Sequence, residues 1–303
     1  MITSLFSKSK LLNFIIVFLI MLLAFILGNS KNGYESVIFG KVILFFICLL
    51  TVLVLNFIVS KNSLTQNNNY QILFFSLFLL ALPNTTANGN ILIANIFLLF
   101  ALRRLITLRS QINVEKKLFD AAFWIAIATL FYFWSGLFFI LIIITLLLYT
   151  DNNIKHWIIP FIGTACVFVI AMSVSIIWYD SFFEIFNITL LVSYDFSGYN
   201  SLQYLITMTM LFSFGLWSSI FYLKGIKQKK KAFRPSFKIV LFAAIISFVI
   251  VVIAPEKNGS EFLFLFAPIA IIITNYVETI EEKWFREIFV AIITFVPFLL
   301  LFL

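Results

Sequence analysis

The sequence predicts an all-α, polytopic membrane protein, and three observations support this class. Apolar residues fill 63% of the 303 positions and the mean hydropathy is +1.10, whereas soluble chains are about 45–50% apolar. Charged residues make up only 11%, against about 25% in a soluble protein. The apolar residues also gather in runs of membrane-spanning length. This composition excludes a soluble enzyme, a disordered chain and a disulfide scaffold, because it offers too little polar surface.

Eleven apolar runs are candidate membrane helices, since a span needs about 20 apolar residues, or fewer when it is tilted or broken. In chain order they cover residues 11–28, 38–60, 71–83, 91–102, 119–134, 136–150, 157–178, 201–223, 239–254, 262–276 and 288–303. The pairs 71–83/91–102 and 119–134/136–150 are short, so each is either two thin spans or a hairpin that does not fully cross. We expect about eleven spans, with nine as the alternative.

The first run follows Lys8 and Lys10 and resembles a secretory signal. The residues after it, Gly28 to Ser30, do not form a small-x-small cleavage site, and further spans follow. We therefore expect an uncleaved first span.

The basic residues predict the orientation. With the N-terminus inside and the C-terminus outside, the inner segments are 1–10, 61–70, 103–118, 151–156, 224–238 and 277–287. They contain 18 of the 21 Lys and Arg residues, and only Lys31, Lys41 and Lys257 fall outside. Cytoplasmic loops carry such an excess of positive charge, which predicts this orientation for a multi-pass protein. The run 224–238 is either an orienting stop-transfer loop, which we favour, or a site for anionic lipid or nucleic acid.

The longest outer loop, residues 179–200, predicts a helix lying at the outer interface over about 181–193. Asp180, Glu184 and Asn187 are spaced i, i+4 and i+7 on one helical face, and phenylalanine and leucine fill the other positions. The aromatic and hydrogen-bonding residues that follow include Asp195 and Tyr199.

The absence of several motifs limits the chemistry. His156 is the only histidine, so we expect no histidine-based metal site and no metal. The sequence contains no phosphate-binding GxxxxGK[ST] motif, and we expect no cofactor. Cys48 and Cys166 lie in separate apolar runs and are interpreted as packing residues. No internal repeat or linker interrupts the chain, which predicts a single integral membrane domain over residues 1–303.

The few outer ionisable residues mark where activity would lie. They are Lys31, Glu35, Lys41, Asp180, Glu184, Asp195, Glu256, Lys257 and Glu261. If the spans 71–83 and 91–102 stop early, an outward-facing cavity opens beside Asn84, Asn88 and Asn90. There, a lysine would pair with a lipid phosphate and a carboxylate would accept a proton from a hydroxyl.

Two features of this layout resemble the GT-C class of membrane glycosyltransferases: the segment Gly33–Ser36 after the first span, and the paired short spans within 119–149. The resemblance implies a polyprenyl-phosphate sugar donor and a catalytic acid in the first outer loop, which is Glu35 here. That loop is shorter than in the class and has one Glu, and the alternative is a Glu35 paired with Lys31. The expected substrate-binding residues are Asp180, Glu184, Asp195, Tyr199, Lys257 and Glu261.

The whole chain also resembles an uncharacterised family of multi-spanning bacterial inner-membrane proteins, which implies a location and no chemistry. Two functions stay open. One is transfer of a sugar from a polyprenyl-linked donor at the outer face. The other is a non-catalytic membrane subunit, or a carrier for an apolar or lipid substrate. The expected partners are membrane lipids, a polyprenyl-linked substrate and other membrane proteins, without nucleic acid.

Overall fold

The computed structural model describes residues 2–30, 38–149, 153–186 and 190–302, and these residues form helices joined by short turns. The α-helices are α1 (Ile2–Phe6), α2 (Leu11–Asn29), α3 (Ile38–Asn62), α4 (Tyr70–Ala81), α5 (Gly89–Thr107), α6 (Val114–Phe131), α7 (Phe139–Leu148), α8 (Ile154–Tyr179), α9 (Leu202–Gln228), α10 (Arg234–Ile253), α11 (Leu263–Thr279) and α12 (Lys283–Leu299). Short 3-10 turns include η1 (Pro83–Thr86), η3 (Phe133–Phe138) and η6 (Ser260–Phe262). Within the described residues there is no β-strand, so the all-α prediction is confirmed.

Each of the eleven apolar runs coincides with one helix or with a 3-10 turn and helix. By length and composition, eight helices in the described part of the chain can cross a membrane, and Tyr70–Ala81 and Phe133–Leu148 are shorter. At 1.5 Å per residue, the 12 residues of α4 extend only about 18 Å, less than the roughly 30 Å hydrocarbon core. The structure therefore shows a multi-pass apolar bundle, while the count of eleven stays a prediction.

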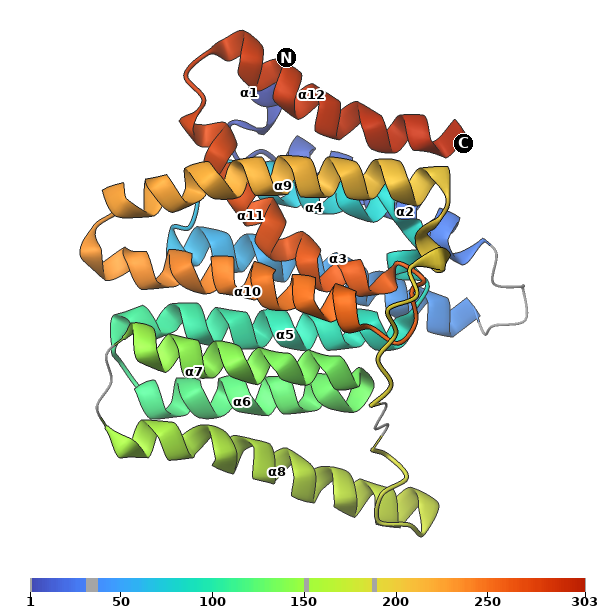
Figure 1. Cartoon of the computed structure of the whole chain (residues 1–303), viewed down its shortest axis with the longest axis vertical. Helices are drawn as coiled ribbons and strands as arrows, with labels where there is room; N and C mark the ends of the chain where they lie inside the picture. The colour runs from blue at the N-terminus through green and yellow to red at the C-terminus, as the bar shows by residue number, and fades with distance from the viewer. Residues whose placement is uncertain (1, 31–37, 150–152, 187–189, 303) are drawn as a thin grey trace.

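The core of the bundle lies around α4 and α11. Every residue of α4 is buried, and α11 is buried from Leu263 to Val277. Helix α11 packs against α4, α9 and α10 and runs obliquely among its neighbours (Figure 1). Helix α8 instead lies at the edge of the bundle, where it packs on α6 and α7 (Figure 1).

The helices run in alternating directions, so the connecting segments gather at two ends (Figure 1). One end, called here the Arg104 end, carries the turns 62–69, 108–113, 229–233 and 280–282. The other, the Glu261 end, carries the turns 82–88, 132–138 and 254–262 and the segment 190–201. The segments predicted to be inner lie at the Arg104 end, as the parity of the spans requires.

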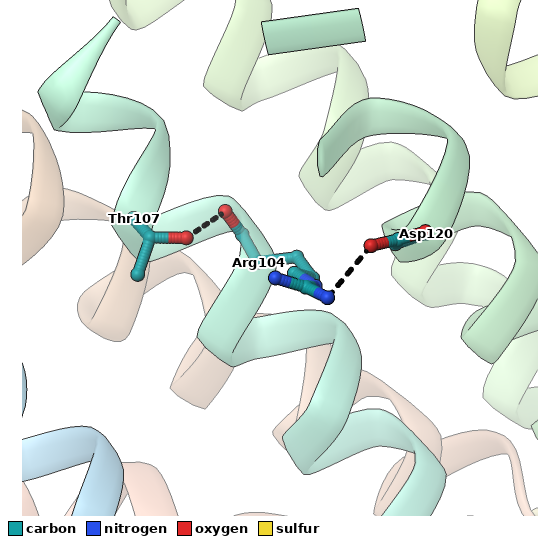
Figure 2. A network of polar contacts seen from close by, with 3 residues as sticks. All are labelled: Arg104, Thr107 and Asp120. Atoms are coloured by element: carbon teal, nitrogen blue, oxygen red, sulfur yellow. Dashed lines mark hydrogen bonds and ion pairs between the residues drawn. The ribbon is translucent and has the colours of Figure 1, made fainter. Parts of the chain in front are cut away.

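Contacts between distant segments hold the Arg104 end together. The Arg109 guanidinium donates to the Asn62 carbonyl at 3.4 Å and lies 3.7 Å from the centre of the Phe233 ring. Arg104 of α5 forms a 2.8 Å ion pair with Asp120 of α6 (Figure 2). The Arg104 carbonyl also accepts a hydrogen bond from the Thr107 hydroxyl at 2.9 Å (Figure 2). The ion pair and the cation–π contact thus give some of the predicted inner basic residues a structural partner.

Candidate functional site

The loop 254–262, between α10 and α11, organises the Glu261 end. The Lys257 ammonium donates to the carbonyls of Val251 and Val252, at 2.8 and 2.7 Å. These carbonyls belong to the last turn of α10, where a helix has no partners of its own for them. The ammonium also lies 4.9 Å from the centre of the Phe196 ring, and burial lowers the pKa of Lys257. Lys257 is therefore engaged in closing a helix end.

Glu261 is almost completely buried, with 1% of its surface exposed. Its Oε1 accepts a very short hydrogen bond from the Tyr199 hydroxyl and a 3.3 Å bond from the backbone N–H of Gly259. Its Oε2 has no hydrogen-bond partner among the described residues. A buried polar atom left in this state is rare and energetically costly.

Two adjoining cavities open beside Glu261, and together they are called here the polar hollow. The first, of ≈ 150 Å³, is lined by Asn88, Asn90, Ile91, Phe131, Tyr132, Phe133, Pro255, Glu256, Asn258, Ser260 and Glu261. The second, of ≈ 540 Å³, is lined by Gly28, Asn84, Ala87, Asn88, Gly89, Asn90, Asn258 and Ser260. Neither lining contains a Lys or Arg among the described residues. The described wall of the hollow is therefore rich in amides, contains two carboxyl groups and includes no basic side chain.

Tyr204 of α9 links the segments around the hollow. Its hydroxyl donates to the Asn258 carbonyl at 2.5 Å and accepts from the Asn84 amide at 2.6 Å. The Asn258 side chain accepts from the backbone N–H of Ser260 at 3.0 Å and also from its hydroxyl at 2.5 Å. These bonds hold η1, α9 and the 254–262 loop in one arrangement.

An apolar groove lies between α9 and α12. Its two sections have volumes of ≈ 370 and ≈ 310 Å³ and share Ser213, Phe214 and Ile292. Further along α9 and α12, towards the Glu261 end, lies a recess of ≈ 190 Å³ lined by Leu27, Ser30, Leu82, Pro83, Asn84, Gln203, Tyr204, Leu300 and Leu301. Asn84 lines both the recess and the polar hollow, whereas the recess and the groove share no lining residue and follow one another along α9 and α12.

The structure brings together some of the predicted site residues. Tyr199 and Glu261 are hydrogen-bonded, and Lys257 lies in the same loop as Glu261. Asp195 is exposed in the 190–201 segment at the same end of the bundle. The backbone N–H of Ser197 donates a hydrogen bond to its Oδ1 at 2.9 Å, and this bond lowers the pKa of Asp195. The asparagines of the 84–90 turn line the hollow that the sequence predicts beside them.

Other predicted residues lie elsewhere. Asp180 ends α8 in a left-handed conformation with φ 52°, and Glu184 is exposed in the turn that follows. The end of α8 is separated from the 254–262 loop (Figure 1). Glu35 lies outside the described residues. Asn258, Ser260 and Tyr204 were missed, although Asn258-Gly259 is a turn signal between two apolar runs.

The helix predicted over 181–193 is not formed by its described residues, which are bends, turns and irregular chain at 181–186 and 190–193. The left-handed Asp180 reverses the chain at the end of α8. The Phe186 ring then packs against Phe168 of α8, with 5.2 Å between ring centres. Contacts with α8 thus replace the helical periodicity that the acidic stripe suggests, in a segment also rich in β-branched residues.

Neither the curated proteins nor the solved structures contain a match to this chain. The resemblance to GT-C enzymes is consequently without support from these comparisons. One family model, described as a family of unknown function (DUF6427), matches residues 1–303. The match covers the whole length of the sequence, and the protein therefore belongs to this family.

Proposed function

We propose that the protein binds a lipid-linked substrate at its Glu261 end and, in the manner of GT-C enzymes, transfers a sugar from a polyprenyl-phosphate donor there. The placement of the polar hollow beside the recess, and of the recess next along α9 and α12 to the apolar groove, supports this proposal. An amphiphile with a polar head and one long apolar chain matches this arrangement, because its head suits the polar hollow and its chain suits the apolar groove.

The length of the groove suits a hydrocarbon chain. On α9 the lining runs from Tyr204 to Trp217, which is about 20 Å of helix. Trp217 donates to the Tyr276 hydroxyl at 2.8 Å, and an aromatic cluster with Phe289 surrounds this end. Because lipid tails are themselves apolar, the hydrocarbon chain of a bound lipid gains little free energy when it leaves the bilayer for the groove. Selectivity must therefore come from the polar head.

In the proposed orientation the N-terminus is cytoplasmic, and the hollow faces the outside of a bacterial inner membrane. The outer face is where a polyprenyl-linked sugar would be used. Glu35 follows Ser30, which lines the recess, by five residues. Glu35 itself lies outside the described residues, and its role as the catalytic carboxyl is proposed from the sequence alone. Asp195 and, further from the hollow, Asp180 and Glu184 are proposed as substrate-binding residues on the same ground.

Photo-crosslinking tests lipid binding directly. The protein in phospholipid nanodiscs is irradiated with a polyprenyl-phosphate sugar that carries a diazirine in its chain, and the labelled peptides are identified by mass spectrometry. We expect labels on α9 and α12, because their facing residues line the groove. Ser213→Trp fills the groove and should reduce labelling several-fold, whereas Leu216→Trp, at an exposed position of the same helix, should not. Equal labelling of both variants contradicts the proposal.

Turnover separates the enzyme from the carrier or non-catalytic subunit. Membranes containing the protein are supplied with a radiolabelled polyprenyl-phosphate sugar, and incorporation into other membrane products is measured. We expect Glu35→Gln to abolish incorporation, since an amide cannot accept the proton of the acceptor hydroxyl. Crosslinking without any incorporation favours the carrier, which the groove also suits.

A further inference from the structure

We infer that the polar hollow takes a neutral, hydroxyl-rich headgroup, that is, a sugar, and that Oε2 of Glu261 accepts a hydrogen bond from one of its hydroxyls. The inference rests on the proposed function and deepens it, because it assigns the part of the substrate that enters the hollow.

The first argument is the unequal environment of the two Glu261 oxygens. Oε1 is held by Tyr199 and by the backbone of Gly259. Oε2 is buried and is without a partner among the described residues, and Glu261 is one of the residues that line the cavity. Buried polar atoms in proteins are normally paired, so this acceptor is a place where a ligand hydroxyl fits. Fixing Oε1 also fixes the direction of Oε2.

The second argument is the chemistry of the lining. Asn90 presents an amide that can both donate and accept, and the Nδ2 group of Asn88 adds a donor, while the Asn88 oxygen caps α5. The Asn258 side chain is held by Ser260 and Glu256 and gives this wall a fixed polar surface. Sugar hydroxyls also donate and accept, so each can be matched by such groups. The wall of this cavity further contains Phe131, Tyr132 and Phe133, and binding sites for small molecules combine such apolar surface with a few placed polar groups.

The third argument is the sign of the charge. The acids in the lining are Glu256 and Glu261, and the described lining contains no base. The nearby Lys257 ammonium donates to the α10 carbonyls instead. Burial raises the pKa of Glu261 to about 7, so the exposed Glu256 is the main negative charge of this wall. A phosphate would meet it without a cation among the described lining residues to pair with, which opposes binding. A neutral sugar meets no such repulsion.

Two amphiphiles of equal chain length test the inference: n-dodecyl β-glucoside and dodecyl phosphate, each titrated below its micelle concentration into the protein in nanodiscs. Affinity is obtained from the shift in melting temperature with concentration. We expect the glucoside to bind at least 10-fold more tightly than the phosphate. Glu261→Gln should weaken glucoside binding about 10-fold, a loss within the range of a single hydrogen bond between neutral groups. Glu281→Gln, an exposed acid at the Arg104 end, should not change it.

A second variant, at a different lining residue, tests the inference independently in case Glu261→Gln does not fold. Asn90 is an exposed member of the lining, and Asn90→Ala should also weaken glucoside binding several-fold while the melting temperature without ligand stays unchanged. Phosphate binding equal to or tighter than glucoside binding overturns the inference but leaves lipid binding intact. The same holds if glucoside affinity is unaffected in both variants. If neither amphiphile binds, the result contradicts both this inference and the proposed function.

Discussion

At the scale of single residues, the 254–262 loop depends on two residues, Gly259 and Lys257. Gly259 has φ +88°, a left-handed conformation, and a Cβ there would lie 2.5 Å from the Tyr204 ring. Lys257 reaches back to the α10 carbonyls, and its own carbonyl leaves room only for a glycine at position 198. The conformation of Gly259 and the buried Lys257 ammonium therefore fix the shape of the loop whose neighbouring residues line the hollow.

We predict that Gly259→Ala destabilises the protein by about 1–3 kcal/mol, because it adds backbone strain and displaces Tyr204 from Asn258. The measurement is thermal or denaturant unfolding in detergent micelles. The matched control is Gly225→Ala in α9, where the space around an added Cβ is open. That change should be neutral or stabilise by about 0.5–1 kcal/mol. Equal effects at both glycines would count against this reading of the loop.

We predict that Lys257→Met lowers stability by about 1.5–3 kcal/mol, since the hydrogen bonds of a charged donor to two helix-end carbonyls are lost. Lys227→Met, at an exposed position of α9, serves as the control and should have little effect. Affinity for dodecyl phosphate should be the same in wild type and in Lys257→Met. A selective loss of phosphate affinity with unchanged stability would instead assign Lys257 to the ligand, the role that the sequence suggests.

At the scale of elements, pairs of helices are joined by a small number of polar contacts within an apolar interface. Arg104 of α5 and Asp120 of α6 form one of these contacts (Figure 2), with 33% and 20% of their side chains exposed. Helices in a membrane gain little from burying apolar surface against each other, since lipid is equally apolar. Packing and such contacts must therefore set the pairing.

A double-mutant cycle measures this contact. We predict that Arg104→Ala and Asp120→Ala each destabilise the protein and that the two effects are coupled by about 1 kcal/mol, between the values typical of exposed and buried pairs. The unfolding free energies of the two single variants, the double variant and the wild type give the coupling. A coupling indistinguishable from zero would mean that packing alone joins α5 to α6.

At the scale of the whole molecule, the two ends of the bundle differ in charge. In the described residues, the Lys and Arg side chains lie in segments at the Arg104 end, apart from Lys41 and Lys257. The polar hollow lies at the opposite end. By the positive-inside rule, the orientation we propose places the basic Arg104 end in the cytoplasm and the polar hollow outside.

Cysteine labelling in intact cells tests this orientation. In a background without Cys48 and Cys166, we predict that Ser110→Cys and Lys230→Cys react with an impermeant maleimide only after the inner face is exposed. Asn90→Cys and Glu256→Cys should react from outside, because they lie at the other end of the bundle. The reverse pattern would invert the orientation and place the hollow in the cytoplasm.

The sequence by itself determined the class of the protein, the position of each helical run and which loops share an end. Hydropathy runs and basic residues are local signals, and they decide these features because lipid requires each spanning segment to satisfy its own backbone. Prolines inside α8, α11 and α12 did not break those helices. The helix predicted over 181–193 is not formed by the described residues of that segment. Contacts with α8, such as Phe186 on Phe168, outweigh the amphipathic pattern of Asp180, Glu184 and Asn187.

Only the tertiary structure decided which residues line the hollow and which hydrogen bonds the Glu261 carboxyl group forms. Tyr199 and Glu261 are 62 positions apart in the sequence, and Asn84 and Tyr204 are 120 apart. No local pattern specifies such pairs, because they arise when α9 packs against α11 and the η1 turn meets the η6 turn. The same packing gives one oxygen of Glu261 a partner from a distant segment and leaves the other unpaired among the described residues, since this outcome depends on which groups meet after the helices have assembled.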